Sequence, residues 1–488
     1  MPRRQVVVLG GGPAGLTAAR ILKCRMPAWP VTVFERQAPD STFGYGVGLS
    51  FSSLDRLRAA DAGVTDALER AAMAVDTWTV RRGGESLSAK NRHGLGIARA
   101  ELLKILQHHA AAAGVEVRMG RQVRLPEVAD ADIVIAADGA GSETRGALAG
   151  PLGATVSHGE LAYLWCGADL AMHEVTLALA RTPAGPLAAH VMPYGPGACT
   201  FQVDAPAAAV GSWDCAGSVA LLEREFADLL GPARLHVKRP DWATFPTVTC
   251  QRWHSGNVVL LGDAAHTAHY TVGSGTGLAV EDAAELAEAL SMSSDPTAAF
   301  EAFEAVRRPK VARLQRRADR SQRWWTTLDV RIGLPLAQLL VSYLTRTGAL
   351  TLAMVTDLNA GLITQCLSQR GLSSPLPRPG ELADAILAQP AEVSAGQMAT
   401  IVHEAGRPTP ADMRGRVEEA RDLAGRGVSR LRIAGPPDRE ALLDRLEIAE
   451  QVRAHVRVTT VVAGPADCRD DLAVGILCGR TDLAELSV

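Results

Sequence analysis

The stretch Leu260–Gly277, LLGDAAHTAHYTVGSGTG, gathers residues that could do chemistry. An apolar run ends in Gly262-Asp263, His266 and His269 follow three residues apart, and a glycine-rich turn comes next. We expect no metal site, because no third ligand stands at a suitable spacing and the pattern is not HExxH. The chain has no GxSxG pattern, which argues against a hydrolase of that type. We interpret His266 as a structural hydrogen-bonding residue and expect His269 to line an active site.

The first forty residues carry a second glycine-rich turn. An apolar strand, QVVVL at 5–9, runs into GGGPAG, in which Gly10, Gly12 and Gly15 have GxGxxG spacing. A helix over 16–22 follows, and a second strand over 31–35 ends in Glu35. The glycines allow a tight turn, close approach of a pyrophosphate and close helix packing, while the acid can accept a hydrogen bond from a ribose. This arrangement predicts a dinucleotide site.

Two further strands end in glycine and an acid. The run 132–137 ends in Asp138-Gly139, and the run 257–261 ends in Gly262-Asp263. Because carboxyl ends of parallel strands meet at one edge of a sheet, these turns can converge on one long ligand, which favours FAD over NAD. We expect Asp263 to hold the ribityl chain. The turn through Gly273, Gly275 and Gly277 leads into a helix over 278–290, whose positive end would face the flavin ring.

These motifs, in this order, resemble the single-component FAD-dependent aromatic hydroxylases. The segments APDSTFGYGVGLS (38–50), GLGIARAELLKILQ (94–107), TFPTVTCQRWHSGNVVLLGDAAHTAH (244–269) and VGSGTGLAVEDAAELAEAL (272–290) resemble the branch that acts on aryl-CoA thioesters, represented by the monooxygenase half of salicylyl-CoA 5-hydroxylase and anthraniloyl-CoA monooxygenase. The resemblance covers about residues 4–370. Tyr270 stands where the wider group usually has a proline, and the aryl-CoA branch has an aromatic residue there.

The resemblance and the glycine turns together give a predicted cofactor site. The resemblance implies FAD contacts at Gly10, Gly12, Gly15, Glu35, Arg99, Asp138, Gly262 and Asp263. The same turns add Pro13, Ala14, Gly273, Gly275, Thr276 and Gly277, and Arg36 follows Glu35 directly. Gly46 is added because we expect FGYGV (43–47) to form a loop beside the flavin, which we call the FGYGV loop.

The resemblance also implies a reaction. NADH or NADPH reduces FAD, O2 adds at the flavin C4a, and the resulting hydroperoxide delivers a hydroxyl group to an electron-rich aromatic ring. Since the cofactor carries the difficult chemistry, the protein needs few acids and bases. The candidates for a catalytic role are His269, Tyr270, Tyr45 and His190, one of which would polarise a ring amine or hydroxyl. A packing or hydrogen-bonding role is the alternative for each of them.

A basic segment over 307–323 contains eight Lys or Arg and a single acid. Arg313 and Arg317 lie one helical turn apart on the same face. The simple interpretation is a solvated helix. The more specific interpretation is that this face binds the phosphates of CoA or an acidic carrier protein, since the guanidinium group of Arg suits phosphate geometry.

Composition narrows the remaining choices. The chain has 488 residues, a formal net charge of −3 and eight cysteines without CxxC spacing. A balanced charge argues against nucleic acid as the main partner, and the cysteine pattern fits a reducing compartment. The apolar segment 334–344 is shorter than a membrane span. We therefore expect a cytoplasmic protein with no membrane partner.

The predicted fold is α/β: a Rossmann-like FAD-binding domain with an inserted antiparallel substrate sheet near 155–250, a helical segment over 297–370, and a small C-terminal α/β domain. We expect the monooxygenase to span 1–372, a linker to span 373–400, and helix–strand units to fill 401–488. The last units faintly resemble the end of a flavin-binding barrel, with Gly479-Arg480 at the phosphate position. Such a truncated remnant would carry no flavin of its own, and would cap the first domain or build a homodimer interface.

We expect the substrate to be an aromatic thioester on CoA or an acyl carrier protein, and three alternatives remain open. The substrate could be a free aromatic or a polyketide natural-product intermediate. The protein could instead be a flavin reductase that does not use O2, or an FAD-binding protein without catalysis.

Overall fold

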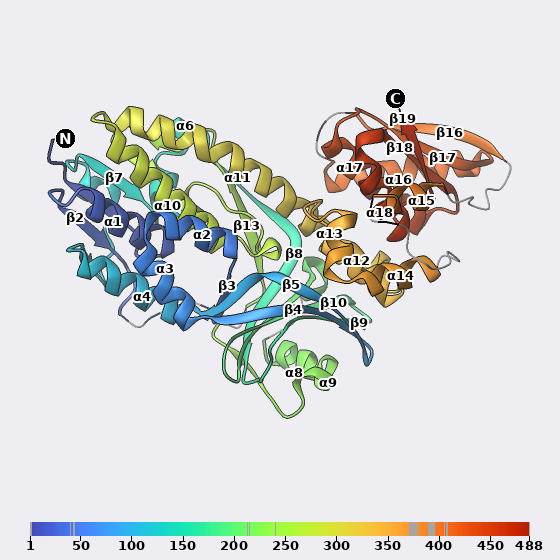
Figure 1. Cartoon of the computed structure of the whole chain (residues 1–488), viewed down its shortest axis with the longest axis horizontal. Coiled ribbons are helices and arrows are strands. Elements are labelled where there is room, and N and C mark those ends of the chain that lie inside the picture. Colours follow the sequence, from blue (N-terminus) through green and yellow to red (C-terminus); the bar gives the residue numbers. More distant parts are fainter. Residues whose placement is uncertain are drawn as a thin grey trace. The chain divides into compact units, whose positions relative to one another are not determined.

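The chain divides into two compact units, and Figure 1 shows the elements of each. The first comprises Met1–Gly84 and Asn91–Thr326, and the second Glu85–Lys90 and Thr327–Val488. The computed structural model describes residues 2–39, 41, 44–211, 213, 215–239, 241–369, 378, 380–388, 396–404, 406 and 408–487. The sequence analysis placed a domain boundary near residue 372, whereas the compact units separate after Thr326.

A six-stranded sheet lies at the centre of the N-terminal part. Its strand order is β14-β15-β7-β1-β2-β6, and every neighbouring pair is parallel except the edge pair β14–β15. The strands are β1 (Val6–Leu9), β2 (Val31–Phe34), β6 (Glu116–Arg118), β7 (Ile133–Ala136), β14 (His254–Ser255) and β15 (Val258–Leu260). Because a parallel sheet is covered on both faces, the strands β1, β2, β7 and β15 read as short apolar runs, which is how the sequence predicted them. The polar edge strands β6 and β14 were not predicted.

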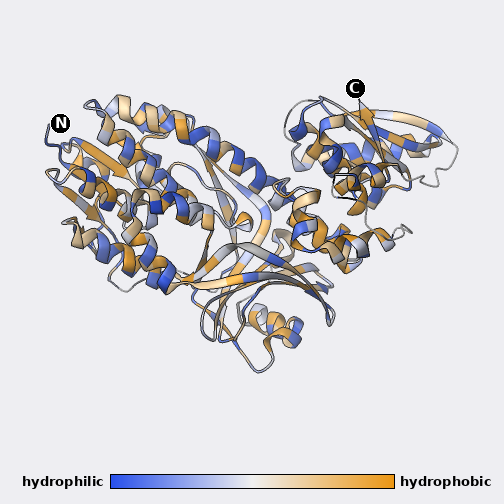
Figure 2. Ribbon diagram, viewed as in Figure 1, coloured by the Kyte–Doolittle hydropathy of each residue, from blue (hydrophilic) through white to orange (hydrophobic). Residues whose placement is uncertain are grey.

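Helices cover this sheet and close its core. Helix α1 packs against α10 and α4, and α10 also contacts α2 and α11. The helices of this part are α1 (Pro13–Arg25), α2 (Phe51–Ala60), α3 (Ala62–Ala71), α4 (Arg99–Ala112), α5 (Glu143–Ala147), α6 (Ala149–Leu152), α10 (Gly275–Met292) and α11 (Pro296–Thr326). Figure 2 shows hydrophobic colouring along the strands of the sheet, and β1, β7 and β15 are buried throughout. Each fully buried aliphatic side chain contributes about 1.5–3 kcal/mol of transfer free energy.

A second, larger sheet has the order β12-β8-β11-β10-β9-β4-β5-β3, with β13 paired to β8. Its strands are β3 (Gly46–Leu49), β4 (Met73–Arg82), β5 (Glu85–Ala98), β8 (Thr155–Ala168), β9 (Val175–Thr182), β10 (Gly185–Gly195), β11 (Ala198–Pro206), β12 (Leu235–Val237) and β13 (Ala243–Thr249). The expected insert near 155–250 supplies β8–β13. The sequence analysis missed β3–β5, and it missed that β4 and β9 pair in parallel.

The two faces of this sheet differ in character. On β8, β10 and β11, one set of alternate residues, including Leu164, Val191 and Phe201, forms a hydrophobic core. The short helices α7 (Ala207–Val210), α8 (Cys215–Glu225) and α9 (Ala227–Leu230) complete that core. Because strand side chains alternate, the other set points to the opposite face. That set is Tyr163, Trp165, His190, Met192, Tyr194, Thr200, Gln202 and Asp204, and we call this surface the polar face of the sheet.

The second unit contains a parallel sheet of order β16-β17-β18-β19. Its elements are α12 (Leu336–Thr345), α13 (Leu352–Leu358), α14 (Ala360–Ser368), α15 (Leu382–Leu387), β16 (Gln397–Val402), α16 (Pro410–Gly425), β17 (Val428–Ala434), α17 (Arg439–His455), β18 (Thr459–Pro465), α18 (Arg469–Leu477) and β19 (Leu483–Ser487). The alternation of helix and strand matches the sequence prediction. A buried ion pair between Arg331 and Glu450, with Nε–Oε1 at 2.7 Å, links its helical and sheet regions.

Two sequence expectations about the C-terminal region change. The expected helical segment 297–370 is divided, because α11 belongs to the first unit and α12–α14 to the second. Part of the expected linker 373–400, namely 373–377, 379 and 389–395, lies outside the described residues, and β16 begins within the rest of it. Arg480, compared above with a phosphate-binding residue, is 7% exposed and donates to the carbonyl oxygen of Ser342 at 3.4 Å.

Candidate active site

The turn between β1 and α1 forms a glycine cradle. Gly10 has φ +107°, and a Cβ placed there would lie 2.2 Å from the carbonyl oxygen of Ala137. A Cβ at Gly15 would lie 2.1 Å from the carbonyl oxygen of Gly10. A Cβ at Gly12 would meet nothing within 4 Å. The first and third glycines are therefore required by packing, while the second faces open space at the start of α1, where backbone N–H groups favour an anion.

Glu35 follows β2 and faces this turn. One of its carboxylate oxygens accepts a hydrogen bond from the backbone N–H of Gly11 at 2.7 Å, and the other accepts from Gln37 N–H at 2.8 Å. Each oxygen keeps a second lone pair, so the carboxylate can still accept from a hydroxyl group. The turn and the acid border a cavity of about 510 Å³, which is also lined by Gly10, Gly12, Arg36, Arg99, Asp138 and Thr144.

The three glycine-acid turns meet at the carboxyl edge of the parallel sheet. Asp138 caps the start of α5, accepting from the Ser142 hydroxyl at 2.6 Å and from the Thr144 hydroxyl at 3.0 Å. The buried guanidinium of Arg145 donates to the carbonyl oxygen of Ala264 at 2.9 Å and to that of Ala140 at 2.6 Å. Arg145 therefore fastens the Asp138 turn to the Asp263 turn.

Asp263 and Arg99 influence each other electrostatically. Desolvation by the surrounding protein atoms raises the pKa of the Asp263 carboxyl, although the side chain is exposed. The interactions with His266 and Arg99 oppose that rise. Burial lowers the pKa of Arg99, and Asp263 opposes that change. The backbone N–H of Arg99 donates to the carbonyl oxygen of Tyr45 at 2.8 Å, which joins the start of α4 to the FGYGV loop.

Helix α10 begins at Gly275 after Gly273, which has φ +64°. No side chain caps its N-terminus, so its first N–H groups remain available to an anionic or polar ligand. A Cβ at Gly275 would meet nothing within 4 Å, whereas one at Gly277 would lie 2.3 Å from Ser53 Oγ. Gly277 therefore lets α10 pack closely on α2. Thr276 between them is half-buried.

A polar cluster occupies one end of the polar face. Asp204, which is 2% exposed, accepts hydrogen bonds from Tyr270 Oη at 2.9 Å and from Gln202 Nε2 at 3.2 Å, both on Oδ1. Its Oδ2 lies 2.8 Å from His190 Nε2. Tyr270 begins the short helix η3 (Tyr270–Val272), so this loop lies against the sheet. Burial and Asp204 raise the pKa of Tyr270 well above its usual value.

His269 lies beside this cluster and is 2% exposed. Its Nδ1 is 3.1 Å from the hydroxyl of Thr271, and its ring packs against Phe245 and Tyr270 with centroids 5.3 and 4.2 Å apart. Burial lowers the pKa of His269 to about 4, against the influence of Asp204. His269 is thus neutral near pH 7, and three of the four predicted catalytic candidates gather around Asp204.

Tyr45, the fourth candidate, lies at the other end of the polar face. Its ring contacts Gly167, and its hydroxyl donates to the carbonyl oxygen of His236. Lys238 Nζ stands 4.8 Å from its ring centroid. Gly46 lies against Tyr194, where a Cβ would come within 2.4 Å of the ring. The described residues of the FGYGV loop, Gly44–Val47, therefore cover the polar face closely, and Tyr45 takes no part in the Asp204 cluster.

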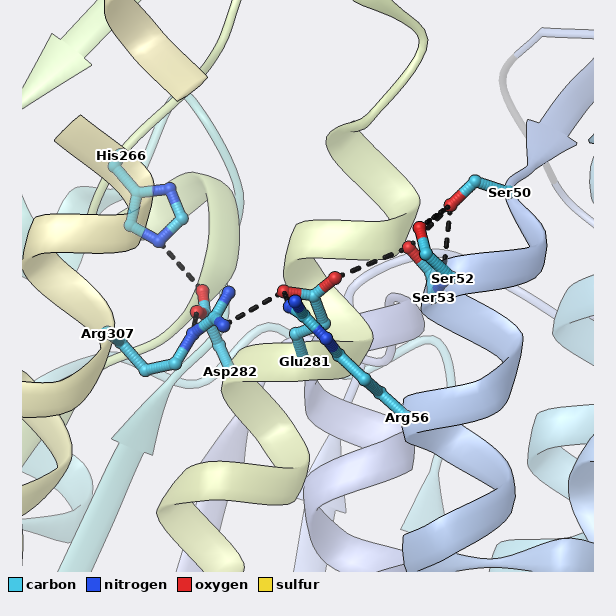
Figure 3. A network of polar contacts seen from close by, with 8 residues as sticks. All are labelled: Ser50, Ser52, Ser53, Arg56, His266, Glu281, Asp282 and Arg307. Carbon is cyan, nitrogen blue, oxygen red and sulfur yellow. Dashed lines mark hydrogen bonds and ion pairs between the residues drawn. The ribbon is translucent and has the colours of Figure 1, made fainter. Parts of the chain in front are cut away.

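A buried ionic network fixes α10 to its neighbours (Figure 3). His266 Nε2 lies 2.7 Å from Asp282 Oδ2, and Arg307 Nε lies 2.7 Å from Asp282 Oδ1. Arg307 also pairs with Glu281 at 2.9 Å, and Glu281 reaches Arg56 on α2. Burial alone would raise the pKa of Asp282, but His266 and Arg307 hold it below its usual value. His266 thus has the hydrogen-bonding role expected of it.

The basic segment of α11 has a mixed environment. Arg307 and Arg320 are 2% and 7% exposed, Arg317 is half-buried and Arg313 is exposed. Part of the basic segment is therefore buried, and fewer of its arginines are exposed for docking than the sequence suggested.

Sequence reasoning missed Asp204, Gln202 and Arg145. Asp204 lies two residues before the end of β11, in the alternating run FQVDAP, where an acid at an inward position was a usable signal. Among the described residues, no group of three or more His, Cys, Asp and Glu side chains is arranged to hold a metal ion. No helix in the described part of the chain is long and apolar enough to cross a membrane.

These residues fit FAD. The open space at Gly12 and Gly275 suits a pyrophosphate and a flavin edge, and Glu35, Asp138 and Asp263 offer carboxylates at the same sheet edge. A dinucleotide cradle combined with a large mixed sheet defines the class: an FAD-dependent monooxygenase of the aromatic hydroxylase type.

Comparison with known proteins supports this class. The chain belongs to the family described as FAD binding domain, whose model matches residues 3–131 and 126–318. It is 38% identical over 347 residues to 3-hydroxy-4-methyl-anthranilyl-(aryl-carrier protein) 5-monooxygenase of Streptosporangium sibiricum, covering 71% of this chain and 95% of that protein. It is 38% identical over 339 residues to salicyloyl-CoA 5-hydroxylase of a Streptomyces species, covering 66% of this chain and 65% of that protein.

A solved structure shows the same fold. A variant of 2-methyl-3-hydroxypyridine-5-carboxylic acid oxygenase matches with a TM-score of 0.56 and 20% identity, covering 70% of this chain and 96% of that one. The predicted family and fold class are confirmed.

Proposed function

We propose that this enzyme uses NADH or NADPH and O2 to hydroxylate an electron-rich aromatic ring presented as a thioester of CoA or of a carrier protein. Two relatives at 38% identity support the thioester, since one is named for an aryl-carrier protein substrate and the other for a CoA substrate. Both names specify position 5 of the ring. Salicyl and anthranilyl groups carry a hydroxyl and an amine next to the carboxyl carbon, so in both rings position 5 lies para to an electron donor.

The observation that carries the proposal is the pairing, within one unit, of the glycine cradle with the Asp204 cluster on the polar face. FAD, when bound, supplies the activation of dioxygen. The chain's own residues bind and orient: Glu35, Asp138, Arg99 and Asp263 would hold the cofactor. The aromatic side chains of the polar face would hold the ring and exclude water.

Three of the four catalytic candidates lie at the cluster end of the polar face. Tyr270 and His190 share Asp204, while His269 is neutral and buried. We assign the catalytic candidates His269, Tyr270 and His190 to the substrate ring, and Tyr45 to the loop that shapes the other end of the polar face.

We also propose that Arg313 and Arg317 on α11 receive the phosphates of CoA or the acidic surface of a carrier protein. Arg313 is exposed, as such a role requires. Charge reversal of both residues should raise KM for the thioester about 30-fold, since the loss of two exposed charge contacts of roughly 1 kcal/mol each amounts to about 2 kcal/mol. The matched control is Arg70→Glu, an exposed arginine on α3. An unchanged KM in the α11 variant would refute this docking site.

The decisive experiment compares thioesters with free acids. FAD-loaded protein is mixed with NADH or NADPH and with salicyl- or anthraniloyl-CoA, the same acyl groups on a carrier protein, or the free acids. Acetyl-CoA is the control for the thioester without a ring. Oxidation of the nicotinamide and incorporation of oxygen from labelled O2 are measured together.

We expect an aryl thioester to stimulate nicotinamide oxidation at least about tenfold more than its free acid, because remote binding energy orients the ring. The hydroxylated product should carry one labelled oxygen. Equal stimulation by free acids would indicate a hydroxylase of free aromatics. Nicotinamide oxidation without labelled product would indicate a flavin reductase, and either result would overturn the proposal.

A further inference from the structure

Asp204 is held by unusual partners for a buried carboxylate. Its hydrogen-bond donors are an imidazole, a phenol and an amide, rather than an arginine or a lysine. Its side chain is 1% exposed, whereas that of His190 is 24% exposed. A buried carboxylate needs such donors, because an unpaired one would be costly. The Asp204 carboxylate is therefore shielded from solvent, whereas the imidazole of His190 remains partly accessible.

The contact with Asp204 fixes the tautomer of His190. An ionised carboxylate accepts hydrogen bonds only, so His190 Nε2 must carry the proton that it shares with Oδ2. The other ring nitrogen, Nδ1, is then a proton acceptor. Trp325 packs edge-on against this ring, with centroids 4.6 Å apart, and limits its rotation.

The position of His190 in β10 determines the face of the sheet on which this acceptor nitrogen lies. His190 lies directly opposite Gln202 on the polar face, and Gln202 lies directly opposite Trp165. The neighbours Ala189 and Val191 point to the hydrophobic core on the other side of the sheet. The strand alternation therefore directs His190 away from the core, to the face that η3 and the FGYGV loop cover.

We propose that Asp204 is a positioning residue that holds His190 with Nδ1 as the proton acceptor for the ring's electron-donating hydroxyl or amine. This rests on the proposed function. When the para carbon bonds to one atom of the dioxygen that bound FAD would activate, the O–O bond breaks, the ring supplies the two electrons and the second oxygen atom leaves as water. Nδ1 takes the proton of a ring hydroxyl, and the lone pair of that hydroxyl oxygen enters the ring. The hydrogen on the para carbon then leaves as a proton to water, its bonding electrons restore the aromatic ring, and Nδ1 returns its proton to the ring oxygen. For a ring amine, Nδ1 accepts a hydrogen bond from N–H.

Asp204→Asn tests the assignment without changing the shape of the residue. Asp204 Oδ1 accepts from both Tyr270 and Gln202, so the amide oxygen of an asparagine would take that position. Its NH2 group would then donate a hydrogen bond to His190 Nε2. Because Nε2 must be unprotonated to accept that bond, the proton of the neutral imidazole would lie on Nδ1. The variant keeps the packing and reverses the tautomer, as removal of a carboxylate beside a catalytic histidine does elsewhere. His190→Gln is the second variant, because its amide can still donate to Asp204 but offers nothing at Nδ1.

The control is Asp169→Asn. Asp169 Oδ2 lies 2.8 Å from His236 Nε2, the same separation as in the Asp204 pair, but both side chains are more than half exposed. This control should leave product formation within about twofold of wild type, because an exposed pair contributes little.

Steady-state kinetics of the FAD-loaded protein with a salicyl thioester provide the first readout. We expect Asp204→Asn and His190→Gln to lower kcat for hydroxylated product about 100-fold or more, the range of a general base, with KM for the thioester within about threefold. Nicotinamide oxidation should continue and yield hydrogen peroxide. A methoxy analogue has no proton to give, so wild type and variants should hydroxylate it equally slowly. A kcat within threefold of wild type in either variant would overturn the proposal.

The second readout needs no substrate. Nitrogen NMR of protein labelled in its histidines, with the His190 signals assigned by their loss in His190→Gln, reports the tautomer directly. We expect protonated Nε2 in wild type and protonated Nδ1 in Asp204→Asn. An Nδ1-protonated wild type would refute the positioning role. If no thioester is hydroxylated by wild type, the proposed function fails, while the tautomer measurement still decides the role of Asp204.

Discussion

The hydroxyl of Tyr270 donates a hydrogen bond of 2.9 Å to the buried carboxylate of Asp204, a residue 66 positions earlier in the chain. This bond joins the glycine-rich loop after the Asp263 turn to β11 of the large sheet. The loop and the helix it precedes belong to the cofactor site, and the sheet provides the polar face. A single phenol therefore connects the region that would hold the flavin with the region that would hold the ring.

Replacing Tyr270 by Phe should destabilise the protein and impair coupling of nicotinamide oxidation to hydroxylation. Asp204 would lose one of its donors inside the protein, which costs about 1–3 kcal/mol. Urea denaturation measures the stability change, and peroxide release measures uncoupling. Tyr194→Phe on the same sheet is the control, since no hydrogen bond of its hydroxyl is found among the described residues. Equal midpoints for the two variants would contradict the expected role of the Tyr270 hydroxyl.

Gly10→Ala should abolish retention of FAD. The backbone there has φ +107°, and the added Cβ would lie 2.2 Å from the carbonyl oxygen of Ala137, so the strand or the turn must move. We expect a loss of at least about 2 kcal/mol in stability from strain of this kind. Flavin absorbance after gel filtration measures retention. Gly146→Ala, at an exposed position in α5 with open space around its Cβ, should keep the flavin.

Glu35→Gln should weaken FAD binding without unfolding the turn. The amide oxygen can replace one of the two acceptors for Gly11 and Gln37 N–H, but the charge that strengthens a hydrogen bond from a ribose hydroxyl is lost. A hydrogen bond to a charged group contributes about 1.5–3 kcal/mol, so Kd should rise about 10- to 100-fold. Fluorescence titration of the apoprotein with FAD gives Kd. An unchanged value would remove Glu35 from the cofactor site.

The cofactor cradle was predictable from the sequence because it depends on local rules. Continuous apolar runs predict buried parallel strands, and Gly15 is needed for packing within its own strand–turn–helix unit, while Gly10 is needed for close approach to Ala137 after β7. The strand β5 was missed since ESLSAKNRHGLGIA combines polar residues and glycines with no clear alternation. Its pairing with the preceding strand β4 and with the more remote β3 decides its conformation.

The substrate side was less predictable because its contacts join residues far apart in the chain. Asp204 is recognisable as an acid at the end of a strand, but nothing local indicates that Tyr270 and His190 both reach it. The basic segment shows the same limit. Arg307 looks solvated in the sequence, yet Glu281 and Asp282 on α10 draw it into the interior.

Arg307→Met should be strongly destabilising. Arg307 is 2% exposed and Asp282 is fully buried, so the variant leaves the Asp282 carboxylate with His266 as its remaining partner. Removing one member of a buried ion pair costs about 3–5 kcal/mol. Arg308→Met is the matched control in the same helix: Arg308 is 51% exposed in its pair with Glu304, and the loss of that pair should cost about 0.5 kcal/mol. Similar urea midpoints for the two variants would show that the network in Figure 3 contributes little to stability.

The protein should become less stable as the pH is lowered below 6.5, partly because of His269. Its pKa is lowered from 6.5 to about 4 by burial, so between these values the unfolded chain binds a proton that the folded protein does not. Stability from this residue is therefore complete above pH 6.5 and is lost as the pH falls toward 4, by up to about 3 kcal/mol. His269→Gln cannot titrate, so its free energy of unfolding should depend less on pH in this window. Urea denaturation of both proteins at a series of pH values measures the difference, and parallel curves would mean that the folded protein accommodates the protonated imidazole.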